Sequence, residues 1–155
     1  MRILIIEDDD LKADALEAHF RSEFLDATVE CAKCMRDGIL ALERVAPDLV
    51  ILDMNLPTYD GRSGEPRASV DARGGREVLR QLSRRTAALK VVVVTQYNLF
   101  GTEGSSITRA EMSTQLASRY PKHYLGTVHF RWSDEQWKEQ LAHLLRSAGI
   151  DKCER

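Results

Sequence analysis

Three short runs of consecutive apolar residues constrain the fold of this chain most strongly. They occupy residues 3–6, 49–52 and 91–94 and consist of Ile, Leu and Val. Runs of about four to eight such residues, without polar alternation, are typical of strands that are buried on both faces. Such strands occur mainly in parallel sheets that are covered by helices on both sides. The chain is therefore expected to have an α/β architecture.

Patterns with helical periodicity separate these runs. Apolar residues at helical spacing predict helices after Asp10, over about residues 35–45, around residues 75–82, after Thr108 and after Ser133. Asp10, Thr108 and Ser133 are the expected N-caps, the last two in capping boxes. Weaker apolar segments at residues 27–31 and 124–128 predict two more strands. Five strands alternating with five helices predict a parallel sheet with helices on both faces.

Two long polar stretches interrupt this alternation. Residues 58–74 are rich in Gly and charged side chains, and residues 96–106 follow the run of four valines. Both leave strands at the same edge of the expected sheet, and loops longer than about 12–15 residues are uncommon unless they are functional or disordered. A chain of 155 residues predicts a single domain. We expect it to carry enlarged loops at about 58–74 and 96–106, the first serving as a lid, as a partner-binding segment or as a disordered connection.

Charge and cysteine content exclude several classes of protein. The formal net charge is -2, from 22 Lys and Arg against 24 Asp and Glu, so a nucleic-acid partner is not expected. No apolar stretch approaches the ~18 residues of a membrane span, and the initial apolar run is too short for a signal peptide, so a cytoplasmic location without membrane association is expected. Cys31 and Cys34 form a C-x-x-C pair, but no second pair of ligands accompanies it. Two small apolar residues near a strand end are therefore the favoured interpretation over a redox or zinc site.

Acidic residues follow two of the apolar runs directly. Glu7, Asp8 and Asp9 follow the first, Asp53 follows the second, and Thr95 ends the third. Ligands of open parallel sheets bind outside the carboxyl ends of the strands, where these side chains should meet. Clustered carboxylates raise one another's pKa values, and a bound Mg²⁺, which prefers oxygen ligands, removes this repulsion. A carboxylate screened in this way can approach an anionic phosphoryl group, and a hydroxyl nearby can donate a hydrogen bond to it.

At these residues the chain resembles the receiver domain of two-component response regulators. The matching motifs are residues 3–9 (ILIIEDD), 47–57 (PDLVILDMNLP), 75–79 (GREVL), 92–95 (VVVT) and 124–125 (YL). The first two are specific in combination, and the later ones are weak individually. The resemblance covers nearly the whole chain and implies a flavodoxin-like, doubly wound, five-stranded parallel sheet of order 2-1-3-4-5.

The resemblance also implies a site and a reaction. Asp53 would accept a phosphoryl group from a histidine kinase or a phosphotransfer protein. Asp8 and Asp53 would hold Mg²⁺ with the backbone carbonyl of Asn55, and Glu7 would lie in or just outside the metal shell. The chain would act as a phosphoacceptor that undergoes only its own phosphorylation and dephosphorylation, not as an enzyme on other substrates.

A switch and further partners are implied in the same way. Thr95 would contact the phosphoryl oxygen and, with the aromatic residue Tyr124, would relay the change to the surface of the last strand and helix. The output would be a contact with a downstream protein. A homodimer through the fourth helix, fifth strand and fifth helix is an open alternative.

The chain departs from the family pattern at two positions. The family has a lysine three residues after the fifth-strand aromatic, where this chain has Thr127. Lys122 enters the strand at its opposite end, whereas His129 and Arg131 follow the strand and are alternative sources of a cation. Gln96 occupies a position where the family prefers a small residue, and its side chain would restrict access to the phosphate.

These departures leave two alternative functions open. One is a pseudo-receiver, a binding adaptor that acts without phosphorylation, which Thr127 and Gln96 favour. The other is a small Mg²⁺-dependent phosphatase with Asp53 as the nucleophile. Asn55 disfavours the phosphatase, because such enzymes need a general acid two residues after the nucleophile and an amide cannot fill that role.

Overall fold

The computed structural model describes residues 1–59, 73–86 and 88–151, which form two sheets and five helices. The strands are β1 (Arg2–Ile6), β2 (Thr28–Ala32), β3 (Leu49–Leu52), β4 (Lys90–Thr95), β5 (Leu99–Phe100), β6 (Ile107–Thr108) and β7 (Tyr124–His129). The helices are α1 (Asp10–Glu23), α2 (Met35–Val45), α3 (Arg73–Leu82), α4 (Arg109–Arg119) and α5 (Gln136–Ser147). The predicted alternation of strands and helices is confirmed.

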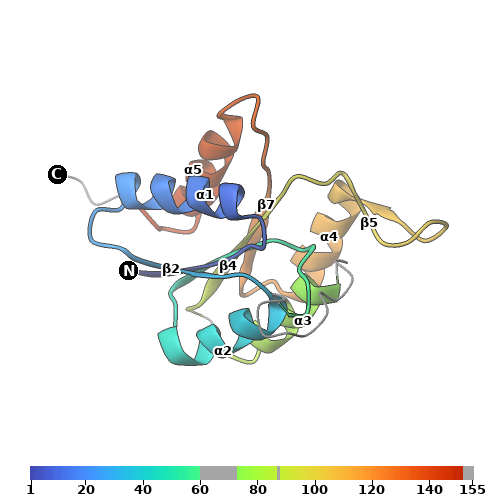
Figure 1. The fold of residues 1–155 in the computed structure, drawn as a ribbon, viewed down its shortest axis with the longest axis horizontal. Helices are drawn as coiled ribbons and strands as arrows, with labels where there is room; N and C mark the ends of the chain where they lie inside the picture. Colours follow the sequence, from blue (N-terminus) through green and yellow to red (C-terminus); the bar gives the residue numbers. More distant parts are fainter. Residues whose placement is uncertain (60–72, 87, 152–155) are drawn as a thin grey trace.

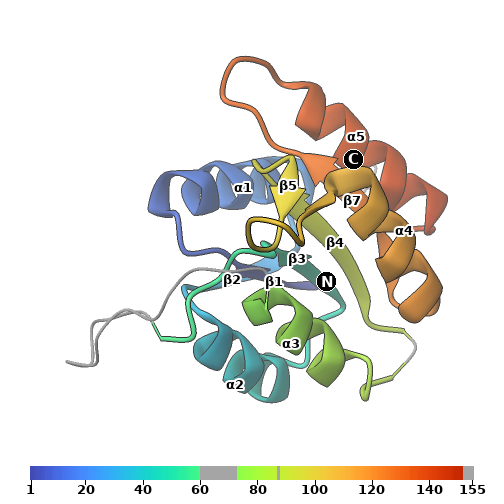
Figure 2. The ribbon, with the colours of Figure 1, turned by 90° about the vertical axis from the view of Figure 1, so that its right-hand side faces the viewer.

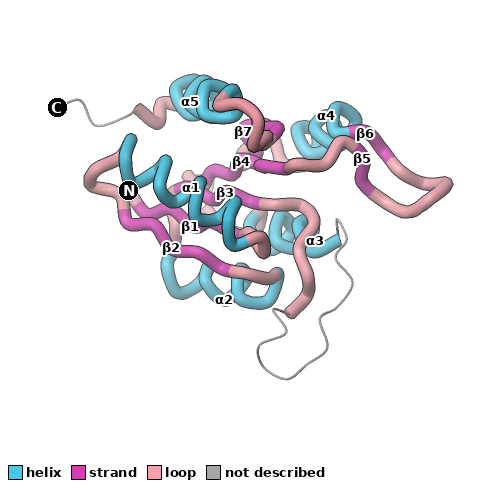
Figure 3. The backbone as a smooth tube through the Cα atoms, turned by 45° about the horizontal axis from the view of Figure 1, so that its top comes forward, coloured by secondary structure: helices cyan, strands magenta, loops and turns pink. Residues whose placement is uncertain are grey.

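The main sheet is parallel throughout, in the order β2-β1-β3-β4-β7 (Figure 3). With β7 as the fifth strand, this is the predicted flavodoxin-like order. The chain moves from β1 outward to β2 and then returns to pair β3 with the other side of β1. The direction of winding therefore reverses between β1 and β3, and loops leave their carboxyl ends in opposite directions. Ligand sites of open α/β sheets lie at such a reversal.

Helices cover both faces of the sheet (Figures 1 and 2). Ile3 and Ile5 of β1 pack into one buried cluster with α1 and α5, whereas Leu4 and Ile6 pack into a second cluster with α2, α3 and α4. Successive side chains of a strand point to opposite faces, so a strand between two helical layers needs apolar residues at every position. This explains the continuous apolar runs.

The helix starts agree only partly with the predicted caps. Thr108 caps α4 in a reciprocal capping box with Glu111, as predicted. The cap of α1 is Asp9, whose carboxylate accepts the Lys12 N–H at 3.0 Å, so the prediction of Asp10 was wrong by one residue. The prediction of Ser133 was wrong as well, because α5 begins at Gln136 without a side-chain cap. The Gln136 N–H donates instead to the carboxylate of Asp134 at 3.1 Å.

One of the two predicted loops contains a hairpin. Within residues 96–106, Leu99 and Phe100 form β5, which pairs antiparallel with β6 at Thr108 and Ile107. Phe100 is buried and packs on the same core as α4. Two-residue strands are too short to produce a periodic signal, so the sequence pattern does not indicate this hairpin. Of the other predicted loop, residues 60–72 lie outside the described residues, and Arg73 already belongs to α3.

A β-bulge in β7 changes the positions of its side chains. Tyr124 pairs with Val91 and Gly126 with Val92, so Leu125 is an extra residue. The bulge brings Tyr124 and Thr127 onto the same side, and their side-chain oxygens lie 2.6 Å apart. In regular pleating, residues three apart would point to opposite faces.

Helix length bears on the expected absence of membrane association. In the described part of the chain, no helix combines the length and the apolar character that crossing a bilayer requires.

Candidate functional site

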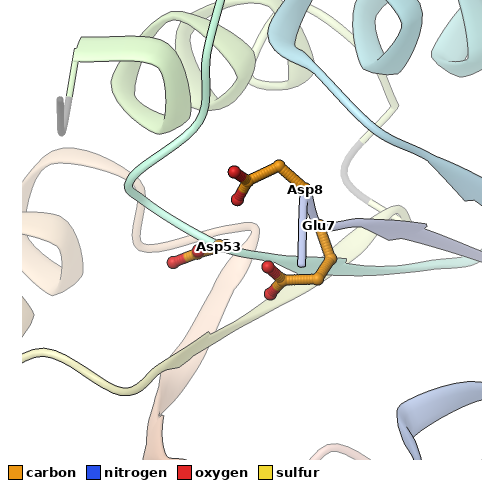
Figure 4. A group of neighbouring side chains, drawn as sticks. All are labelled: Glu7, Asp8 and Asp53. Carbon is orange, nitrogen blue, oxygen red and sulfur yellow. The ribbon is translucent and has the colours of Figure 1, made fainter. Parts of the chain in front are cut away.

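Three carboxylates converge at the reversal of winding between β1 and β3. Glu7 and Asp8 follow β1, Asp53 follows β3, and one ligand oxygen of each lies within 4.8 Å of the others (Figure 4). They line a pocket of about 340 Å³ whose walls are Glu7, Asp8, Asp9, Asp10, Leu11, Lys12, Asp53, Gln96 and Tyr97. The structure therefore brings together the acidic residues that the sequence places at neighbouring strand ends.

Two of these carboxylates are almost inaccessible to solvent. Glu7 is 2% exposed and Asp53 is 4% exposed. Burial raises the pKa of Glu7 to about 7, Lys12 opposes this increase, and the Asp53 charge adds to it. Burial also raises the pKa of Asp53; Lys12 and the Asn55 N–H, which donates to Oδ1 at 3.3 Å, oppose it. The pocket therefore holds more negative charge than its surroundings stabilise, and this favours binding of a cation.

Lys12 is a buried cation of this site that the sequence reasoning missed. Its Nζ lies 2.5 Å from Glu7 Oε2 and 3.7 Å from Asp53 Oδ2, and it donates a hydrogen bond to the carbonyl of Val94 at 2.9 Å. The side chain is only 2% exposed. The sequence does contain a pattern that indicates this burial. Lys12 lies four residues before Leu16 and eight before Phe20, which places it on the buried face of α1. A lysine on the apolar face of a helix needs an anionic partner.

The other predicted residues lie around the pocket or away from it. Thr95 is fully buried at the end of β4, where Oγ1 accepts the Tyr97 N–H at 3.1 Å, and it does not line the pocket. Gln96 does line it. Tyr124 begins β7, at the opposite end of the strand from the pocket, and Thr127 lies opposite Val93 within that strand.

None of the three alternative cations considered from the sequence lines the acidic pocket. Lys122 is exposed just before β7, at the far end of that strand. His129 lies opposite Thr95, but burial and then the nearby Arg109 charge lower its pKa. Arg131 forms an ion pair with Asp134 at 3.5 Å.

The two cysteines of the C-x-x-C pair form no disulfide and have separate structural roles. Cys34 caps α2, and its sulfur accepts the Asp37 N–H at 3.4 Å. Cys31 lies in β2 and donates to Glu17 at 3.5 Å. Burial raises the pKa of the Cys31 thiol to about 12, and the Glu17 charge adds to the increase. These contacts agree with the interpretation of two packed side chains rather than a redox or metal pair.

Comparison with known sequences relates the chain to response regulators. No family model matches the chain. An uncharacterized protein, y4jR, of Sinorhizobium fredii is 30% identical over 143 residues, which cover 91% of this chain and 94% of that protein. The Detocs response regulatory protein DtcB of Enterobacter cloacae is 28% identical, covering 91% of this chain and 95% of that protein.

Comparison with solved structures gives the same fold. The response regulator domain of CheB from Thermotoga maritima has a TM-score of 0.64 and 18% identity, covering 97% of this chain and 98% of that one. The response regulator TrrA of the same organism, solved in complex with Mg²⁺-BeF, has a TM-score of 0.60 and 20% identity, covering 93% of this chain and 98% of that one. The chain belongs to the receiver-domain family of two-component response regulators, so its role lies in two-component signal transduction.

Proposed function

We propose that this chain is a receiver that accepts a phosphoryl group on Asp53 and signals through protein contacts. One observation carries the proposal: the Asp53 carboxylate lies at the end of β3 within 4.8 Å of the Glu7 and Asp8 carboxylates. Asp53 thus lies beside the two acids that follow β1 and beside a buried lysine. The similarity to DtcB, a Detocs response regulatory protein, supports the same role.

The residues of the pocket fit Mg²⁺. Their donors are carboxylate oxygens, the ligands that Mg²⁺ prefers. Glu7 Oε2 is buried and makes no hydrogen bond among the described residues, although it forms the ion pair with Lys12. We propose that Asp8 and Asp53 hold Mg²⁺ together with the backbone carbonyl of Asn55, and that Glu7 lies in or next to the metal shell. When bound, Mg²⁺ supplies positive charge that neutralises the site.

The proposed reaction is a transfer of one phosphoryl group. A carboxylate oxygen of Asp53 forms a bond to phosphorus while the bond from phosphorus to the donor breaks, and its electron pair leaves with the donor group. The donor is the phosphohistidine of a histidine kinase or a phosphotransfer protein. The demands on the protein are mainly positioning and charge neutralisation, since phosphoryl transfer needs little else. Water later hydrolyses the acyl phosphate and regenerates the carboxylate.

Thr95 and Tyr124 are the proposed switch residues. Thr95 Oγ1 accepts the Tyr97 N–H, which leaves the hydroxyl hydrogen of Thr95 able to donate to a phosphoryl oxygen. Such a contact would change the position of Gln96 and Tyr97 at the mouth of the pocket. Tyr124, whose phenol oxygen is hydrogen-bonded to Thr127, would pass the change to the surface of β7 and α5. A downstream protein or a second copy of the chain would bind there.

Intact mass measurement tests this function. The chain is incubated with Mg²⁺ and acetyl phosphate, and wild type is compared with Asp53→Asn and with Asp14→Asn, an exposed acid of α1. We expect wild type and Asp14→Asn to gain the mass of one phosphoryl group that is lost in acid or base, and Asp53→Asn to gain none. No adduct on wild type would contradict phosphorylation.

A pseudo-receiver adaptor is the second candidate. Two observations favour it: Thr127 replaces the family lysine within β7, and the Gln96 side chain lines the pocket. This function predicts no adduct on wild type, but retained binding of the partner protein by Asp53→Asn. Consumption of acetyl phosphate far above the protein concentration would indicate instead the small phosphatase.

A further inference from the structure

The ammonium group of Lys12 lies where the carboxyl ends of three neighbouring strands meet. It is in contact with Glu7 after β1 and Val94 in β4, and it lies 3.7 Å from Asp53 after β3. The helix that carries it starts directly after β1 and packs on the sheet through Leu16 and Phe20. The side chain therefore reaches from α1 across the end of β3 to β4.

Neither the packing of α1 nor its N-cap explains why a charged side chain is buried at position 12. An apolar side chain of similar length would fill the same space between α1 and the sheet without the cost of removing an ammonium group from water. The N-cap bond of α1 uses only the backbone N–H of Lys12, so it does not require lysine either. What the lysine supplies here, and an apolar side chain would not, is a positive charge 3.7 Å from the Asp53 carboxylate.

Phosphorylation of Asp53 increases the need for this charge. A phosphoryl group carries about 1.5–2 negative charges at neutral pH, more than the carboxylate charge it replaces. Glu7 and Asp8 remain beside it, and a divalent cation alone would leave the pocket with net negative charge. An ammonium group has three donors, and in Lys12 the Val94 carbonyl accepts one of them. The remaining donors face Glu7 and Asp53.

No other position in the described structure supplies this cation. Of the described residues that line the acidic pocket, Lys12 is the one with a basic side chain. Thr127 stands where the family has its lysine by sequence count. The bulge in β7 directs its hydroxyl toward Tyr124, 2.6 Å from the phenol oxygen.

We propose that Lys12 of α1 contacts the phosphoryl group on Asp53 and takes the place of the lysine that the family carries on its fifth strand. The proposal rests on Asp53 as the phosphoryl site. It assigns the cation to a different element of the fold, so the absence of lysine at position 127 does not by itself make the chain a pseudo-receiver.

The test compares Lys12→Met with Lys33→Met as a matched control. Methionine keeps the length of the buried side chain and removes its charge. Lys33→Met removes the same charge close to the pocket, since Lys33 Nζ pairs with Asp10 at 2.8 Å. Lys33 itself does not line the pocket. Binding of beryllofluoride, a phosphoryl analogue, is measured by fluorine NMR in saturating Mg²⁺, and binding of Mg²⁺ alone is measured by calorimetry.

We expect Lys12→Met to bind beryllofluoride roughly 10- to 100-fold more weakly, the loss of one charged hydrogen bond, and to bind Mg²⁺ alone at least as well as wild type. Lys33→Met should match wild type in both. Unchanged beryllofluoride affinity in Lys12→Met, or an equal loss of affinity for Mg²⁺ alone, would overturn the proposal and leave Lys12 as a counter-ion of Glu7.

Two further measurements distinguish a missing Lys12 contact from misfolding of the variant and from failure of the proposed phosphorylation. If Lys12→Met does not fold, the contact is tested in wild type by the NMR resonance of the Lys12 Nζ nitrogen. This resonance is assigned by its absence in Lys12→Arg. We expect it to shift when beryllofluoride is added to the Mg²⁺-bound protein, and an unchanged resonance contradicts the contact. Beryllofluoride binding that depends on Lys12, without any adduct from acetyl phosphate, would support Lys12 while the proposed function fails. Failure of wild type to bind beryllofluoride would overturn the Lys12 contact.

Discussion

At the scale of single residues, the neighbours of a side chain determine its chemistry. Glu7 and Glu17 have the same side chain, yet Glu7 is buried with its pKa raised to about 7, whereas Glu17 pairs at the surface with Arg21. The raised pKa of Cys31 has the same origin, since burial and the Glu17 charge both disfavour the thiolate. Acids and thiols of this chain therefore need structural context before a reactivity is assigned to them.

Cys31 should accordingly be unreactive in the folded protein at pH 8. Its pKa of about 12 lies above the ordinary value of 9.0, so the thiol stays protonated, and the thiolate is the reactive form. Because the folded-state value is the raised one, any stability from this group is present below about pH 9 and is lost as the pH rises toward 12. Alkylation by iodoacetamide, followed by peptide mass spectrometry, should be slow in buffer and fast in denaturant.

Glu17→Gln is the informative variant for this thiol. It removes the negative charge beside the Cys31 sulfur and should speed alkylation of Cys31, whereas Cys34, whose sulfur lies at the start of α2, should be unaffected. Fast alkylation of Cys31 in the folded wild type would contradict the raised pKa.

At the scale of elements, the helix starts show how local hydrogen bonds set boundaries. The two sequence patterns T-x-x-E at Thr108 and S-x-x-Q at Ser133 are both of the capping-box type. Only the first forms a box, because Asp134 takes the N–H of Gln136 at the start of α5. A capping pattern thus competes with other acceptors in the same turn.

Thr108→Ala should destabilise the protein by about 1 kcal/mol, since it removes the side chain that accepts the Glu111 N–H. Ser133→Ala is the matched control and should change the free energy of unfolding by less than about 0.5 kcal/mol, because Ser133 is exposed and caps nothing. Urea denaturation measures both. Equal losses from the two substitutions would show that the box at Thr108 is not what stabilises α4.

At the scale of the whole molecule, the position of Asp53 depends on how α3 packs against the end of β3. Gly75 of α3 lies against the backbone there, and a Cβ at this position would come within 2.5 Å of Met54 Cα and 2.9 Å of the Asp53 carbonyl oxygen. Glycine allows this close approach. The helix layer below the sheet thus reaches the proposed phosphoryl site directly.

Gly75→Ala should therefore move the turn that carries Asp53, weaken Mg²⁺ binding and destabilise the protein by about 1–3 kcal/mol. Gly38→Ala in α2 is the control, because the atoms nearest to its added Cβ would be side-chain atoms of Ile6, with Cδ1 at 2.8 Å, rather than backbone atoms. We expect Gly38→Ala to lower the melting temperature with little effect on Mg²⁺ affinity. Calorimetric titration and thermal unfolding distinguish the two. Wild-type Mg²⁺ affinity in Gly75→Ala would show that the turn tolerates the contact.

The sequence by itself determined the sheet, its helical layers and the meeting of Glu7, Asp8 and Asp53. These follow from local pattern, because strands buried on both faces need continuous apolar runs and parallel strands place their carboxyl ends at one edge. Their meeting at that edge needed no knowledge of the loops or of side-chain packing.

Only the tertiary structure decided which cation joins these acids. Counting residues along β7 places Thr127 at the position of the family lysine. A bulge changes the direction of the side chains in this strand, and a bulge leaves no periodic signal in the sequence. Lys12 is four residues from Asp8 in sequence, yet its role depends on the carbonyl of Val94, which is 82 residues away. The sequence could therefore place Lys12 on the buried face of α1, but the partners of its long, flexible side chain were set only when the elements packed.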